Sequence, residues 1–112
     1  MDTLTYTQDQ VNLIIRLKTK KKETDTVLHA LYETIAPTHK EEGCLEYRVL
    51  QEDRSILVMG RWKNRMSLDM HLLLQFHLHL FEELLPPLCK KISVSIYKEL
   101  EPPITALSLR DD

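Results

Sequence analysis

Apolar and polar residues alternate along four segments of the chain, as in β-strands whose successive side chains point to opposite faces. The four predicted strands are Val11–Lys18, Cys44–Leu50, Ser55–Trp62 and Lys90–Leu100. Only the polar turn 51–54 separates the second strand from the third. This short connection predicts an antiparallel hairpin in the middle of the chain.

The segment after the first strand carries apolar residues at steps of three and four, which is the spacing of one helix face. Thr24 or Asp25 is a candidate N-cap, because either side chain can accept a hydrogen bond from the first helical turn. Pro37 has no backbone N–H and disfavours helix at the residue before it. We therefore expect the helix to end or kink at Pro37.

A second helix is predicted over Met66–Leu85, where residues are apolar on nearly all sides of a helical projection. Such a helix is usually buried on more than one side. Asn64 or Ser67 can cap its start. Residues 76–80 also alternate like a strand, but the Leu, Met, Gln and Glu content favours helix, with a break near Leu74.

The order of these elements is strand, helix, two strands, helix and strand. It corresponds to the ferredoxin-like βαββαβ fold of the α+β class, with both helices on one face of a four-stranded antiparallel sheet. The other face still carries apolar residues, which are Ile14, Leu50, Leu57 and Met59. Burial of apolar surface is worth about 25 cal/mol per Å², so the pattern predicts a homodimer packed sheet to sheet.

The composition is that of an ordinary globular protein, with 43% apolar and 29% charged residues. The 112 residues suffice for one domain, 1–112, with a folded part over about 10–100 and loose ends at 1–9 and 101–112. The net charge of −2, with mixed signs, argues against a nucleic-acid partner. Without a signal peptide or an apolar run of membrane-spanning length, we predict a cytoplasmic protein with no membrane partner.

Several kinds of site are excluded by residue type and spacing. The two glycines are too few for a glycine-rich phosphate loop. Cys44 and Cys89 form no CxxC pair and no disulfide framework, and they are expected to be buried thiols. His77 and His79 would point about 200° apart on a helix. Since no other cluster has zinc spacing, no metal site is predicted.

Trp62 and His71 form the best candidate site. A strand that ends at Trp62 and leads directly into a helix places this ring beside the first helical turns. The two rings either line the mouth of a pocket or belong to the core. An imidazole titrates near neutral pH and can accept a proton from a phenol. Asn12, in the first strand, can donate a hydrogen bond to a substrate or can satisfy a neighbouring backbone group.

The run PTHKEEGCLEY at 37–47 resembles the helix exit and second strand of antibiotic biosynthesis monooxygenase (ABM) domains. The nine-residue step from Trp62 to His71 is similar too, as is the apolar helix with Phe76 and Phe81. The Pro-Pro pair and the last strand complete the likeness, which covers about residues 11–99.

This resemblance implies a dimeric α+β barrel with clefts between sheet and helices. Family members include cofactor-free oxygenases that oxidise phenols, quinols and polyketide aromatics with O₂. The resemblance implies catalytic roles for His71, Asn12 and Trp62, and it implies no cofactor. The residues expected to bind a small aromatic substrate are Trp62, Tyr47, Phe76, His77 and Phe81.

Two departures from the family pattern keep other functions open. Many members carry Glu where this chain has Gly60, and some oxygenases carry Asn where it has Val58. The first hypothesis is a monooxygenase that acts on a small phenol or quinol. The alternatives are a haem binder or haem-degrading enzyme, with His71 or His77 as axial ligand, and a dimeric small-molecule-binding module without catalysis.

Overall fold

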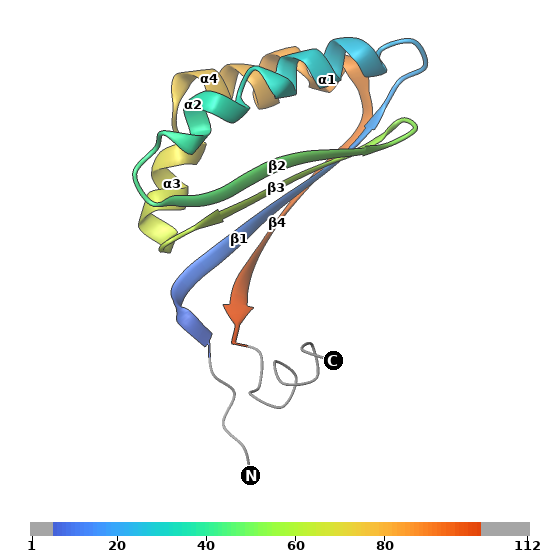
Figure 1. Ribbon diagram of the computed structural model, residues 1–112. Coiled ribbons are helices and arrows are strands. Elements are labelled where there is room, and N and C mark those ends of the chain that lie inside the picture. Colours follow the sequence, from blue (N-terminus) through green and yellow to red (C-terminus); the bar gives the residue numbers. More distant parts are fainter. Residues whose placement is uncertain (1–5, 102–112) are drawn as a thin grey trace.

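The computed structural model describes residues 6–101 and contains one four-stranded antiparallel sheet (Figure 1). The strands are β1 (Tyr6–Thr19), β2 (Cys44–Glu52), β3 (Ser55–Trp62) and β4 (Cys89–Leu100). They lie in the order β2-β3-β1-β4. This order and the helical crossovers confirm the ferredoxin-like α+β fold.

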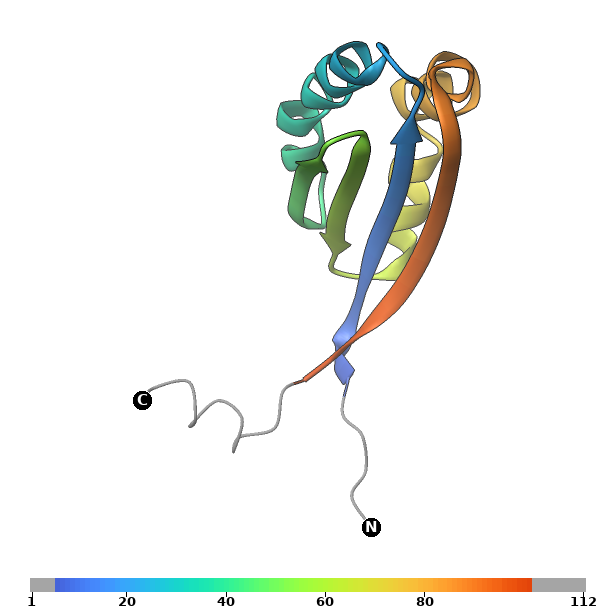
Figure 2. The same ribbon diagram turned by 90° about the vertical axis from the view of Figure 1, so that its right-hand side faces the viewer.

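The first strand is longer than predicted, because it already begins at Tyr6 and includes residues expected to be loose. Tyr6 pairs with Leu100, so β1 and β4 continue together beyond the hairpin of β2 and β3 (Figure 2). The rest of the predicted loose ends, 1–5 and 102–112, lies outside the described residues.

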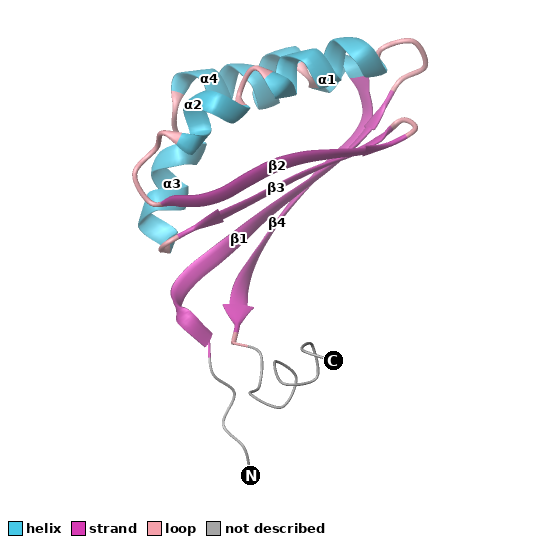
Figure 3. Cartoon of the chain, in the orientation of Figure 1, coloured by secondary structure: helices cyan, strands magenta, loops and turns pink. Residues whose placement is uncertain are grey.

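The helices occupy one face of the sheet (Figures 1 and 3). Four α-helical segments are followed by a π-helix and a 3₁₀ turn. Their bounds are α1 (Thr24–Tyr32), α2 (Ile35–His39), α3 (Arg65–Leu72), α4 (Gln75–Leu78), η1 (His79–Leu84, π) and η2 (Pro86–Leu88, 3₁₀). No helix among residues 6–101 has both the length and the apolar character to cross a membrane.

The first helical region differs from its prediction at both ends. Its N-cap is Glu23, which makes no side-chain capping bond, and the Thr24 hydroxyl instead lies 2.6 Å from that of Thr19. The helix ends at Tyr32, before Pro37, which lies inside the short helix α2. A proline is tolerated there because backbone N–H groups in the first turn have no intrahelical partner.

The second helical region is divided as predicted. Asn64 caps α3 by accepting a hydrogen bond from the Ser67 N–H at 2.8 Å. The chain turns out of helix at Leu74, whose ψ of 141° is that of extended backbone. The helical path then changes direction, which brings residues on both sides of the break to the same side of the sheet.

The core lies between this helical layer and the facing side of the sheet. Val11 pairs with Trp62, and Leu13 with Gly60, so these residues share the covered face. Leu13, Val58 and Trp62 are fully buried, together with Leu31 from α1 and Leu68 from α3. The core therefore reaches the end of β3, where Trp62 lies beneath α3.

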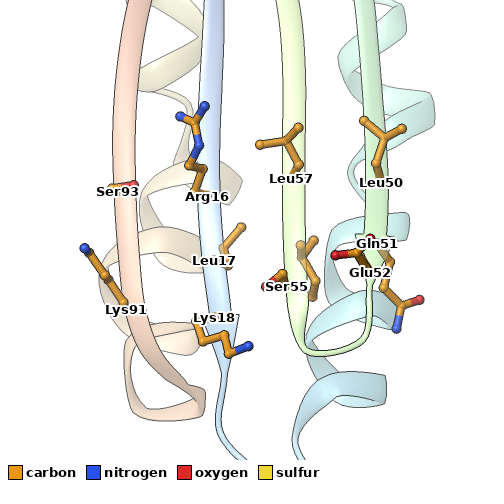
Figure 4. Close-up of a pocket in the computed structure, with 11 residues that line it drawn as sticks. Arg16, Leu17, Lys18, Leu50, Gln51, Glu52, Ser55, Leu57, Lys91 and Ser93 are labelled. Carbon is orange, nitrogen blue, oxygen red and sulfur yellow. The ribbon is translucent and has the colours of Figure 1, made fainter.

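The opposite face of the sheet has no helix over it in the described chain (Figure 1). Asn12, Ile14 and Arg16 alternate with the buried residues of β1 and point to this side. A hollow of about 490 Å³ crosses part of it, lined from all four strands (Figure 4). Of the four apolar residues expected on this face, Leu50 and Leu57 lie in that lining.

Candidate active site

A second cavity, of about 320 Å³, lies between the loop that follows α2 and the helix α3. Its lining includes Glu41, Asn64, Met66, Met70 and His71. We call it the Glu41 pocket. Its lining residues lie at the end of the sheet where β3 leads into α3, and Figure 3 shows these two elements.

Gly43 allows the loop to close against α3. Its φ of 86° lies in the left-handed region that favours glycine, and a Cβ there would overlap the Ser67 side chain. The loop is also tied to the end of β3, because the Lys63 N–H donates to the Gly43 carbonyl at 2.8 Å. These contacts fix the position of Glu41, two residues earlier.

Glu41 and His71 form the polar centre of the pocket. His71 Nδ1 lies 2.8 Å from Oε1 and 3.0 Å from Oε2 of Glu41. The imidazole is fully buried, whereas 17% of the Glu41 side chain is exposed. A molecule in the pocket can therefore touch the carboxylate, with the imidazole behind it.

Burial changes the protonation of both partners. It raises the pKa of Glu41 to about 7 and lowers the pKa of His71 to about 4, because a low-dielectric interior disfavours either charged form. The indole N–H of Trp62 has no hydrogen-bond partner among the described residues, yet it faces the Glu41 carboxylate and offsets part of the rise. Near pH 7 the imidazole is neutral and Glu41 can both hold and release a proton.

Three buried polar atoms near this centre have no hydrogen-bond partner within residues 6–101. They are His71 Nε2, Trp62 Nε1 and Thr38 Oγ1. Buried polar groups are nearly always hydrogen-bonded, and exceptions are concentrated where a water, ligand or catalytic role is involved. The Glu41–His71 pair thus lies among buried polar atoms that lack hydrogen-bond partners within the described residues.

The rings expected to bind substrate gather around His71. Its ring centroid lies 4.7 Å from Trp62, 4.9 Å from His77, 5.9 Å from Tyr47 and 6.0 Å from Phe76. Phe81 continues the cluster, 4.6 Å from His77. The structure thus brings together every predicted site residue except Asn12.

These rings fill the space between sheet and helices instead of leaving it open. Trp62 is completely buried, Tyr47 is 2% exposed and His77 is 8% exposed. The Tyr47 hydroxyl lies 3.3 Å from that of Thr34 and so points into the protein. Of the predicted set, His71 is the member that reaches the lining of the Glu41 pocket.

The packing of Trp62 explains why glycine occupies position 60. The Trp62 ring lies back over this residue, and a Cβ at Gly60 would overlap two atoms of the ring. Any larger residue at position 60 would require the Trp62 ring to move. The absence of a glutamate at this position is therefore linked to the closed position of the indole.

Asn12 lies on the other face of the sheet. It pairs with Arg61. The Arg61 side chain points away from the helices, opposite to that of its neighbour Trp62. Its Nδ2 donates to Glu99 Oε1 at 3.0 Å. The sheet thus separates Asn12 from the pocket, which the alternation along β1 already implies.

The two candidate haem ligands, His71 and His77, are both packed against neighbouring groups. His71 Nδ1 lies 2.8 Å from Glu41 Oε1, and its Nε2 is buried. His77 is packed between the rings of His71 and Phe81. The described residues also contain no group of three His, Cys, Asp or Glu side chains placed to hold a metal ion.

Glu41 was not among the candidate site residues predicted from the sequence. The signal was present, since Glu41 belongs to the EEGCLEY run that carries the family resemblance. What could not be read is that Gly43 folds this loop onto α3, so that residues 30 positions apart come into contact.

Comparisons with known proteins agree with this architecture. The family model described as "Antibiotic biosynthesis monooxygenase" matches residues 11–82. That range contains β1 from Val11 onward, all of β2 and β3, Glu41, Trp62 and both buried histidines. No curated protein matches the chain significantly.

Solved structures have the same fold at low sequence identity. A Shewanella oneidensis protein is 20% identical with a TM-score of 0.84, over 89% of this chain and 100% of that one. A Mycobacterium tuberculosis protein is 21% identical with a TM-score of 0.77, over 84% of this chain and 98% of that one. The crystal structure of an antibiotic biosynthesis monooxygenase is 19% identical with a TM-score of 0.70, over 83% and 99%.

Proposed function

The chain belongs to the antibiotic biosynthesis monooxygenase family, and on this premise we propose that it is a cofactor-independent monooxygenase. Its substrate is a small aromatic molecule with a free hydroxyl group, of the phenol or quinol type. The observation that carries the proposal is the buried Glu41–His71 pair at the inner end of an open pocket. Such a pair can remove a proton from a hydroxyl group near neutral pH.

The size and lining of the pocket support this substrate class. A volume of about 320 Å³ lies at the lower end of ligand-binding cavities and fits a molecule of one or two rings. Met66 and Met70 supply flexible, polarisable walls that suit aromatic faces. Asn64 and the Glu41–His71 pair supply the few polar groups that orient a ligand.

The proposed reaction draws its electrons from the substrate. Loss of the hydroxyl proton leaves an electron-rich phenolate, which reduces O₂. One oxygen atom enters the ring and the other leaves as water, so that a naphthol plus O₂ yields a naphthoquinone plus water. The protein's contribution is to deprotonate and orient the aromatic molecule away from bulk water.

The proposal includes a homodimer formed through the uncovered sheet face. Ile14, Leu57 and Met59 are only partly buried there, beside the exposed Leu50 and Tyr97. Both signs of charge are present on the same face, with Arg61 3.6 Å from Glu46 and 4.0 Å from Glu99. Such a mixed surface can be complementary to itself in a two-fold arrangement.

The test is oxygen consumption with 1-naphthol and with substituted quinols, followed by mass analysis of products formed under ¹⁸O₂. We expect protein-dependent uptake and one labelled oxygen atom per product, with uptake reduced at least tenfold by His71→Asn. His79→Asn is the matched control, because that imidazole is exposed and interacts with Glu83 on the helix surface. Uptake equal to that of protein-free solutions for every substrate would reject the activity, and saturable binding without turnover would indicate a binding module.

A further inference from the structure

We propose that Glu41, not His71, is the catalytic residue that takes the proton from the substrate hydroxyl, and that His71 is a positioning residue that holds the Glu41 carboxylate. This inference rests on the proposed function and specifies how its site acts. It changes the assignment made from sequence, in which the imidazole was the base.

Access from the pocket distinguishes the two residues. The His71 side chain is 0% exposed, and its Nδ1 is already occupied by the two Glu41 oxygens at 2.8 and 3.0 Å. Glu41 presents an exposed edge to the same pocket. A bound hydroxyl group therefore meets a carboxylate oxygen before it can reach an imidazole nitrogen.

His71 cannot easily turn to offer its other nitrogen. Its ring is packed between Trp62 at 4.7 Å and His77 at 4.9 Å, with Phe76 across its edge at 6.0 Å. Rotation within this close-packed cluster would displace at least one of these rings. The Nδ1 nitrogen thus stays directed at Glu41, which is the geometry of a residue that orients a base.

The surroundings of Glu41 leave its carboxylate without a cationic partner. His71 faces it from α3 and the Trp62 N–H from β3, and burial raises the pKa of Glu41 to about 7. Burial raises the pKa of Cys44 and that of Tyr47 on β2, and the nearby Glu41 carboxylate adds to both rises. Lys63, the cation at the pocket, is instead bound to Glu42 at 2.9 Å. His77 is the other titratable group behind the pair, and it contacts His71, not Glu41.

The proton transfer is balanced within the pair and the substrate. The substrate O–H bond breaks, its electron pair stays on the phenolate oxygen, and a new O–H bond forms on Glu41. The neutral His71 keeps its Nδ1–H directed at the carboxylate while Glu41 is ionised, which holds the carboxylate in position at the pocket. O₂, the oxidant of the proposed reaction, then receives the electrons from the phenolate, and Glu41 returns its proton to water at the pocket mouth.

The experiment compares pH profiles of kcat/KM for wild type, Glu41→Gln and His71→Asn with 1-naphthol. Wild type should show a rising limb with a midpoint near pH 7. Glu41→Gln should lose about a hundredfold and the limb with it, since general-base catalysis is worth at least that much. His71→Asn should lose less and keep the limb, because an asparagine amide can still donate to the carboxylate.

A binding readout separates this inference from the proposed function. The probe is 4-nitrophenol, whose phenolate absorbs at a longer wavelength than the phenol. Wild type should bind it, and Glu41→Gln should bind it without promoting its ionisation, while His79→Asn behaves as wild type. If wild type neither binds the probe nor oxidises naphthol, the proposed function fails and this inference with it. If binding and turnover hold but Glu41→Gln retains the limb and His71→Asn abolishes it, only the present inference is overturned.

Variant folding is checked by circular dichroism and urea denaturation before either assay. Should His71→Asn fail to fold, His71→Gln replaces it, since its longer amide can also reach Glu41. A ¹³C-labelled glutamate titration of the wild-type protein gives a readout that needs no variant of His71. A Glu41 carboxyl that titrates at its ordinary pKa near 4.5 would contradict the role of this residue as the base.

Discussion

The two faces of the sheet present the same strands to different surroundings. On the covered face, Leu13, Val58 and Trp62 lie under the helices and are fully buried. On the uncovered face, Leu50 and Tyr97 remain 40% and 51% exposed beside charged neighbours. The Glu41 pocket lies at the edge of the covered layer, and the hollow of about 490 Å³ lies on the uncovered face.

The linings of the two cavities suit different functions, which their volumes alone would not distinguish. The larger hollow spans four strands and has no buried titratable group in its lining, which suits a second protein surface. The smaller cavity ends on a buried carboxylate and imidazole, and perturbed titratable groups are concentrated at catalytic sites. This contrast supports the proposals that the chemistry occurs at the smaller cavity and that a subunit contact forms on the uncovered face.

The largest contrast is expected when an aromatic residue is removed from each face. Trp62→Ala should lower the free energy of unfolding by about 3–5 kcal/mol, because a fully buried ring leaves a cavity next to Tyr47 and His71. Tyr97→Ala, on the uncovered face, should cost less than about 1 kcal/mol. Urea denaturation at concentrations low enough to prevent self-association measures both, and equal losses would contradict the contrast between the faces.

The second prediction concerns the uncovered face as a subunit contact. Ile14→Asp should weaken self-association at least about a hundredfold, because two unpaired carboxylates would be buried at a two-fold interface. The monomer should remain folded, since the side chain points away from the helices. Sedimentation velocity over a dilution series gives the dissociation constant.

Leu73→Asp is the control for that measurement. Leu73 is equally apolar and 71% exposed, but it lies at the break between α3 and α4. Its substitution should leave the dimer intact. A dimer that tolerates Ile14→Asp as well as Leu73→Asp would show that the copies meet elsewhere.

The third prediction concerns the contact between Gly60 and Trp62. Gly60→Ala should destabilise the chain by about 1–3 kcal/mol, because the new Cβ overlaps the indole and the ring must shift. Trp62 is the only tryptophan, so its fluorescence reports the shift directly. Ser55→Ala, at an exposed position of the same strand, should change neither stability nor emission. An unchanged spectrum for Gly60→Ala would mean that the ring does not lie over this residue.

The fourth prediction uses the opposite pKa shifts of Glu41 and His71. The raised pKa of Glu41 favours the folded state at low pH, and this contribution is lost between its ordinary value of 4.5 and about 7. The lowered pKa of His71 acts in the other direction, and its contribution is lost as pH falls from 6.5 to about 4. In wild type the two slopes oppose each other between pH 4.5 and 6.5.

Variants should separate these slopes. Between pH 4.5 and 6.5, the free energy of unfolding of Glu41→Gln should rise more steeply with pH than that of wild type. For His71→Asn, the difference from wild type should change with pH in the opposite direction. Urea titrations at half-unit pH steps measure both, with His79→Asn as an exposed control. Buried His77, whose pKa is lowered to about 4, contributes the same slope to wild type and both variants. Changes of the same sign relative to wild type in the two variants would therefore show that Glu41 and His71 are not buried as described.

The fold was predictable because apolar and polar residues follow the periodicity of a strand or a helix along its main elements. The alternation from Val11 to Lys18 identified a strand and also its two faces. The break at Leu74 and the Asn64 cap followed from local residue chemistry. The start of β1 at Tyr6 was missed, since polar residues 7–10 carry no apolar alternation and the strand is extended by the pairing of Tyr6 with Leu100.

The site was only partly predictable, because its geometry depends on contacts distant in sequence. Trp62 and His71 were brought together correctly by a short connection. Glu41 was missed because a loop turned by Gly43 delivers it across 30 residues. Asn12 was grouped with the site by resemblance, although its place in the alternation puts it on the face opposite to Trp62.

The smallest effect is expected at Asn12, and it tests the separation of the two faces most directly. Asn12→Ala removes one partly buried hydrogen bond to Glu99 and should cost about 1 kcal/mol of stability. Because the sheet lies between this residue and the Glu41 pocket, naphthol oxidation should change less than about twofold, far below the loss expected for Glu41→Gln. Oxygen uptake measures this, with Ser95→Ala on the same face as the control. A loss of tenfold or more in Asn12→Ala alone would mean that the uncovered face takes part in the chemistry, and the division between a catalytic face and a contact face would no longer hold.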